Sequence, residues 1–152
     1  MHVINIKPLK AFTDNYIWLL ETNEEVSVVD PGDAKPVLDY LSKTNKNIRD
    51  IFITHHHFDH TAGVPELENI ISGSIYGPKN SYELINEKVT QGDTLSSLGI
   101  KFEIIEVPGH TLDHIAFYNE ENDILFCGDT LFAGGCGRVF EGTFDQMFES
   151  LN

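Results

Sequence analysis

The chain has 152 residues, enough to bury the core of one domain, and we expect that domain to span residues 1–152. Its 41% hydrophobic and 22% charged residues are typical of a globular protein. The net charge of −14 argues against a nucleic-acid partner, because binding phosphates requires a basic surface. The sequence has no apolar run of membrane-spanning length, no signal-peptide core in residues 1–10 and only two cysteines, so we expect no membrane partner and a cytoplasmic location.

Short apolar runs in the first part of the chain predict strands separated by turns. Where β-branched and aromatic residues gather, we expect strands over residues 3–6, 15–20, 26–29 and 51–53. Asp33 is a suitable N-cap for a helix that follows the third strand, with Val37 and Leu41 on one helical face. A short helix is also expected near residues 65–67.

The second part of the chain is predicted to contain more strands and one more helix. Expected strands lie within 70–76, over 100–107, and in a hairpin of 115–118 with 124–127. Thr143 and Gln146 match a capping box, which predicts a helix that is still running when the sequence stops at Asn152. Many strands with few helices indicate an α/β or α+β layered sheet, and the abrupt end predicts a truncated chain.

Four of the seven histidines fall within residues 55–60, directly after a predicted buried strand. His55 and His57 are two residues apart, so an extended backbone turns both rings to one face, within reach of one metal ion. Asp59 and His60 follow and can reach a second ion. Imidazole and carboxylate ligands without thiolate suit Zn²⁺, Fe or Mn at a hydrolytic centre. An expression tag would lie at a terminus, whereas this cluster is internal.

Two later residues, His110 and Asp129, also follow predicted strands, and each comes directly after a glycine that permits a sharp turn. The two oxygens of Asp129 could bridge two cations, although a turn-capping role is the alternative. The predicted arrangement places one ion on three histidines and a second on Asp59 and His60, with Asp129 shared; the three histidines are His55, His57 and His110.

Three neighbouring residues are expected to act behind the ligands or in the fold. His56 projects away from the face of its neighbours, so we expect it to form a hydrogen bond behind a ligand or at the surface. Asp30, at the end of a predicted strand, is equally compatible with orienting a ligand imidazole and with forming a turn. His114 is predicted to be structural and not a ligand.

The segments 54–60, 108–111 and 128–130 resemble the metallo-β-lactamase superfamily, and segments 14–16, 30–32 and 131–138 more narrowly resemble glyoxalase II (hydroxyacylglutathione hydrolase). This resemblance implies an αββα sandwich, here truncated before its last elements and lacking the helical C-terminal domain of that family. It also implies a further metal-binding histidine beyond residue 152. Asp113 stands where the resemblance leads us to expect glycine.

The resemblance implies hydrolysis of S-D-lactoylglutathione, a glutathione thioester, to D-lactate and glutathione in methylglyoxal detoxification, with two Zn²⁺ ions as cofactors. A metal ion lowers the pKa of bound water from about 15.7 towards about 7, and Asp59 and Asp129 are the expected catalytic residues. Arg138 either contacts glutathione or is a surface arginine. We expect a monomer. The alternatives are a persulfide dioxygenase, another hydrolase of the superfamily, or a non-catalytic metal-binding module.

Overall fold

The computed structural model describes residues 4–79 and 82–152. Six strands form the larger sheet in the order β1-β2-β3-β4-β5-β6, antiparallel from β1 to β3 and parallel from β3 to β6. These strands are β1 (Asn5–Ala11), β2 (Asn15–Glu21), β3 (Glu25–Val29), β4 (Asn47–Phe52), β5 (Ile75–Pro78) and β6 (Glu87–Val89).

The second sheet is antiparallel and has the order β10-β9-β8-β7. Its strands are β7 (Thr94–Ser97), β8 (Ile100–Glu106), β9 (Ile115–Asn119) and β10 (Ile124–Phe126). A small hairpin follows, made of β11 (Leu131–Phe132) and β12 (Gly135–Cys136).

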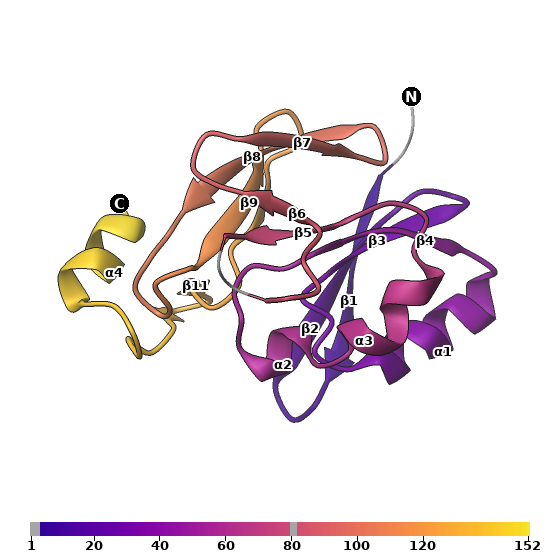
Figure 1. The fold of residues 1–152 in the computed structure, drawn as a ribbon, viewed down its shortest axis with the longest axis horizontal. Coiled ribbons are helices and arrows are strands. Elements are labelled where there is room, and N and C mark those ends of the chain that lie inside the picture. Colours follow the sequence, from indigo (N-terminus) through magenta and orange to yellow (C-terminus); the bar gives the residue numbers. More distant parts are fainter. Residues whose placement is uncertain (1–3, 80–81) are drawn as a thin grey trace.

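The helices are short, and the longest of them covers the six-stranded sheet. They are α1 (Ala34–Thr44), α2 (Phe58–Thr61), α3 (Val64–Leu67), the 3₁₀ helix η1 (Glu68–Ile70) and α4 (Phe144–Ser150). Helices α1 and α3 lie together, whereas α4 lies at the opposite end of the molecule (Figure 1). No helix in the described part of the chain is long and apolar enough to cross a membrane.

Two hydrophobic clusters show how the layers stack. Val28 belongs to the cluster that also contains Val37 of α1 and Leu67 of α3, so this cluster lies between the larger sheet and the helices. The next residue along β3, Val29, belongs to the cluster between the two sheets. Side chains alternate across a strand, so β3 contributes to both clusters. The described residues therefore form three layers in the order helices, six-stranded sheet and four-stranded sheet.

The core between the sheets is rich in aromatic residues. Phe52 of β4 stacks on Phe117 of β9 with ring centroids 4.9 Å apart, and its edge-to-face contact with Phe102 of β8 measures 5.5 Å. All three rings are fully buried. Because β4 ends at Phe52, this packing fixes the strand end from which the histidine segment continues.

Both predicted helix caps are confirmed. The Asp33 carboxylate accepts from the backbone N–H of Lys35, and Thr143 and Gln146 form the reciprocal capping box at α4. The predicted strand at 70–76 is partly wrong. Ile70 ends the 3₁₀ helix η1, and Ile71 forms only a single bridge with Ile48 before β5 begins.

Other strand boundaries also differ from prediction. The first strand runs on to Ala11, well past the predicted end at residue 6; Val3 lies outside the described residues. Strands β6 and β7 were not predicted because they are short and contain charged or hydroxyl residues. Their backbones pair with β5 and β8, which local sequence does not reveal.

Candidate metal centre

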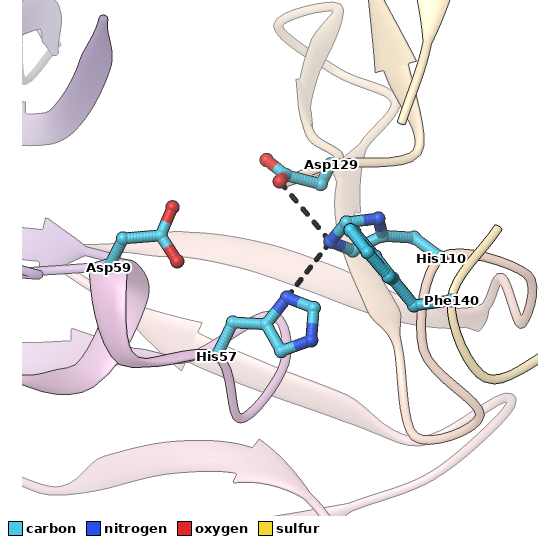
Figure 2. Close-up of a pocket in the computed structure, with 5 residues that line it drawn as sticks. All are labelled: His57, Asp59, His110, Asp129 and Phe140. Carbon is cyan, nitrogen blue, oxygen red and sulfur yellow. Dashed lines mark hydrogen bonds and ion pairs between the residues drawn. The ribbon is translucent and has the colours of Figure 1, made fainter. Parts of the chain in front are cut away.

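The predicted ligands meet at one edge of the two packed sheets. The histidine segment follows β4, His110 follows β8 and Asp129 follows β10. A pocket of about 340 Å³ opens there, lined by His57, Asp59, His110, Asp129 and Phe140. In Figure 2, His110 lies between His57 and Asp129, while Asp59 faces them from across the pocket. Strand ends far apart in sequence thus supply one cluster of side chains.

Among the described residues, four sets of side chains have ligand atoms within 4.8 Å of one another and could hold a metal ion, and two of these sets match the predicted arrangement. We name them the trihistidine group (His55, His57 and His110) and the carboxylate group (Asp59, His60 and Asp129). The two groups adjoin, because His110 Nε2 lies 3.3 Å from Asp129 Oδ2. Asp129 therefore lies beside both groups, and its role as a shared ligand stays a prediction.

A buried hydroxyl orients the His55 ring. Thr54 Oγ1 donates its single proton to Asp30 Oδ2 at 2.7 Å, so it accepts from His55 Nδ1 at 2.9 Å. The backbone N–H of Thr54 also donates to Asp30 Oδ1, at 2.8 Å. These bonds leave His55 Nε2 as the lone-pair nitrogen, and that atom faces the cluster.

His110 and His60 are oriented in the same way. The Nδ1 of His110 donates to the backbone carbonyl of Arg138 at 2.7 Å, and the Nδ1 of His60 donates to Asp30 Oδ2 at 2.9 Å. In each ring Nε2 is left directed at the cluster. Second partners of this kind set the tautomer and direction of metal-binding imidazoles.

The buried nitrogen atoms test whether a cation fits. His55 Nε2 is buried and has no hydrogen-bond partner among the described residues, whereas the equally buried His60 Nε2 lies 3.2 Å from Asp129 Oδ1. Leaving such atoms unpaired costs about 1–3 kcal/mol each, so buried polar atoms are normally satisfied. A divalent cation accepts a lone pair where these rings offer one, so the residues present fit a metal ion.

His114 lies within the cluster and yet cannot serve as a ligand. Its ring stacks on His55 at 4.5 Å, but Nδ1 donates to the carbonyl of Ile115 and Nε2 accepts the backbone N–H of Asp129. Both nitrogens are therefore occupied. Burial lowers the pKa of His114 to about 4, which keeps it neutral at pH 7. The ring positions Asp129, in agreement with the structural role predicted for it.

Asp59 is held by a residue to which the sequence analysis gave no role. Asn15, the first residue of β2, donates its side-chain N–H to Asp59 Oδ2 at 2.8 Å. The motif that contains Asn15 contributed to the family resemblance, and this was the only sequence signal for it. Phe140, exposed beside the rings of His57 and His110, is a second such residue and forms a wall of the pocket.

The charges of the cluster divide between its two groups. Burial and the neighbouring imidazoles lower the pKa values of His55 and His57, so both rings are neutral. Burial would also lower the pKa of His60, but Asp30, Asp129 and Asp59 surround that ring and raise its pKa to about 12. A hydrogen bond from His60 lowers the pKa of Asp59, which stays ionised.

Three remaining predicted residues lie around this cluster. Asp30 contacts both Thr54 and His60, and so orients one ring in each group. His56 contacts Asp113 and Glu141, outside the cluster. Arg138 is exposed, and its contact with the cluster is through its backbone carbonyl.

Gly128 turns the chain sharply after β10, which brings Asp129 to the cluster. Its φ is +50°, and an added Cβ would lie 2.4 Å from Thr54 Oγ1 and 2.7 Å from His114 Cε1. Any side chain there would both strain the backbone and displace two residues that orient the cluster.

Two sheets packed face to face, with imidazoles and carboxylates gathered at their strand ends, define a metal-binding protein of mixed α/β class. The chain belongs to the metallo-beta-lactamase superfamily, whose family model matches residues 12–95 and 81–151. This membership confirms the predicted fold class.

Among curated relatives, hydroxyacylglutathione hydrolase from Pseudoalteromonas translucida is 50% identical over 99% of this chain, which spans only 59% of that protein. The crystal structure of BLEG-1 B3 metallo-beta-lactamase aligns with 97% of this chain and 83% of its own chain, with a TM-score of 0.87. At 21% sequence identity, this match shows a similar fold. The crystal structure of TTHA1623 in a di-iron-bound form matches 94% of this chain and 82% of its own, with a TM-score of 0.77 and 25% identity.

Proposed function

We propose that this protein is a metal-dependent thioester hydrolase that acts on hydroxyacylglutathione, with S-D-lactoylglutathione as the substrate and D-lactate and glutathione as products. The observation that carries the proposal is the convergence of His55, His57, His110 and Asp129 from three strand ends around the buried, unpaired Nε2 of His55. The 50% identity to a hydroxyacylglutathione hydrolase supports the choice of substrate.

The two groups would hold two divalent cations, with Asp129 between them. We propose Zn²⁺, because imidazole and carboxylate ligands in a hydrolytic centre suit it, although Fe and Mn are compatible with the same donors. The di-iron form of TTHA1623 supports a count of two ions. When bound, a divalent cation supplies Lewis acidity, lowering the pKa of water towards about 7 and polarising a carbonyl.

The chain's own side chains would position the reactants. Asp59, held by Asn15 and ionised, lines the pocket and would orient the attacking water by accepting a hydrogen bond from it. Phe140 covers one side of the pocket and would shield the thioester carbon from bulk water. A thiolate leaves readily, so no strong general acid is required. Arg138 is proposed to meet a carboxylate of glutathione.

Loss of the thioester absorbance of S-D-lactoylglutathione, measured with the zinc-loaded chain, tests this function. We expect weak hydrolysis that disappears after chelation and returns when Zn²⁺ is added back. The same sample should consume no oxygen when supplied with glutathione persulfide. Oxygen uptake with iron and no thioester cleavage would instead identify a persulfide dioxygenase. Metal binding without either reaction would identify a non-catalytic module.

The proposed location is the cytoplasm, where a glutathione thioester would be formed. Both cysteines are free, and Cys127 is half-buried while Cys136 is exposed. Free thiols of this kind suit a reducing compartment.

A further inference from the structure

His56 lies between two carboxylates on the outer side of the metal centre. Its Nδ1 is 3.0 Å from Asp113 Oδ1, and its Nε2 is 2.9 Å from Glu141 Oε1. Each ring nitrogen of His56 therefore faces a carboxylate oxygen at hydrogen-bond distance. All three side chains are partly exposed, at 37% for His56, 13% for Asp113 and 34% for Glu141.

The two carboxylates belong to the segments that hold His110. Glu141 Oε2 accepts from the backbone N–H of Leu112 at 3.0 Å, and the N–H of Glu141 donates to the carbonyl of His110 at 3.4 Å. Asp113 lies three residues after His110 in the same loop. The contacts of His56 therefore connect the segment after β4 to both segments that surround His110.

His57 is the member of the trihistidine group that lacks an anchor behind its ring. His55 and His110 each donate from Nδ1 to a fixed oxygen, whereas the one hydrogen bond of the His57 ring among the described residues joins its Nδ1 to His110 Nε2, 3.0 Å away. The position of His57 must then come from its backbone, and the adjacent residue is His56.

We propose that His56 is a positioning residue which, through Asp113 and Glu141, fixes the distance between His57 and His110. Asp113 stands where the family resemblance leads us to expect glycine, which has no side chain to contact His56. The inference rests on the proposed metal site and is independent of the substrate. Exposed ion pairs contribute little to stability, so this role predicts an effect on metal binding and not on folding.

The test measures the metal affinity of the His56→Phe variant, which keeps an aromatic ring but lacks both ring nitrogens. Competition with a chelator should show Zn²⁺ affinity of the trihistidine group lowered about 10- to 100-fold, the range for residues that orient metal ligands. Cobalt(II) bound to the same group should show altered visible absorption. Glu141→Gln and Asp113→Asn should each give a smaller loss, and the two losses should combine non-additively.

Asp39→Asn is the matched control, because Asp39 is an exposed carboxylate paired with Lys35 on α1, away from the cluster. It should leave zinc affinity and the cobalt spectrum unchanged. If His56→Phe and Glu141→Gln both keep the parent affinity and spectrum, the positioning role is wrong. Should His56→Phe fail to fold, the two carboxylate variants decide alone. If the parent chain binds no metal at all, the proposed metal site fails, and with it this inference.

Discussion

The trihistidine group and the carboxylate group lie side by side but are built on different principles. In the first, three imidazoles offer lone pairs, and hydroxyl or carbonyl oxygens behind His55 and His110 hold their rings. In the second, one histidine stands among carboxylates, and Asp59 and Asp129 are 45% and 24% exposed. The His55 and His110 rings of the first group are held in place by these oxygens, whereas the second group attracts cations by charge and is open to water.

Because of this difference, we expect the two groups to bind metal ions with different affinities. Rings that are already held in place, as those of His55 and His110 are, lose little conformational entropy on binding, while partly exposed carboxylates must be ordered and are screened by salt. We therefore expect the trihistidine group to fill first when the chain is titrated with Zn²⁺. Two equally tight sites in a calorimetric titration would contradict this order.

The largest expected effect comes from removing a ligand of the first group. His110→Ala should reduce zinc affinity of the trihistidine group by more than about 100-fold, beyond the range for residues that only orient ligands. Elemental analysis after gel filtration at limiting free zinc should show the loss of one bound ion per chain. Retention of full zinc content would show that His110 is not a ligand.

Asp30 should affect both groups, because it orients His55 through Thr54 and contacts His60 directly. Asparagine can adopt the backbone φ of +51° found at Asp30, so Asp30→Asn removes the charge without straining the backbone. We expect the zinc affinity of both groups to fall about 10- to 100-fold. Thr54→Val is the comparison variant and should weaken the trihistidine group more than the other. If the two variants lower the zinc affinity of both groups equally, Asp30 and Thr54 do not act on the groups in the different ways proposed.

Asn15→Ala should act on the carboxylate group alone. Without the donor, Asp59 loses its orienting bond, and we expect about a 10-fold loss of affinity at the second ion with the first unchanged. Asn5→Ala is the matched control, since Asn5 donates to Glu21, which the structure places outside both groups. A loss at the trihistidine group in Asn15→Ala would argue against two separable groups.

The smallest effect on either group is expected from Glu21→Gln. Burial opposes ionisation of Glu21, but hydrogen bonds from Lys46, Tyr40 and Asn5 together lower its pKa below 4.5. The charged form therefore stabilises the fold above about pH 4.5, and this contribution is lost as pH falls. Glu21→Gln should lower the free energy of unfolding at pH 7 by about 1–2 kcal/mol and flatten its decline in acid, with zinc affinity unchanged. Urea unfolding at pH 3 to 7 measures this, and equal losses at pH 7 and pH 3 would contradict it.

From the sequence alone, the main features of the fold could be predicted because they depend on local patterns. Apolar runs at strand periodicity predicted most of the core strands, and the side chains of Asp33 and Thr143 predicted the starts of two helices. The two-residue spacing of His55 and His57 likewise predicted rings that lie together, and the structure places them 4.8 Å apart. Their role as ligands stays a prediction.

Only the tertiary structure decided how each of these side chains is used. His110 and His114 lie in the same loop between β8 and β9, but the carbonyl of Arg138 frees Nε2 in the first, whereas Asp129 occupies it in the second. Asn15 reaches Asp59 across 44 positions of sequence, and strands β6 and β7 exist because β5 and β8 pair with them. Local sequence sets which groups a residue offers, but the partner of each group comes from distant segments that meet only when the sheets pack.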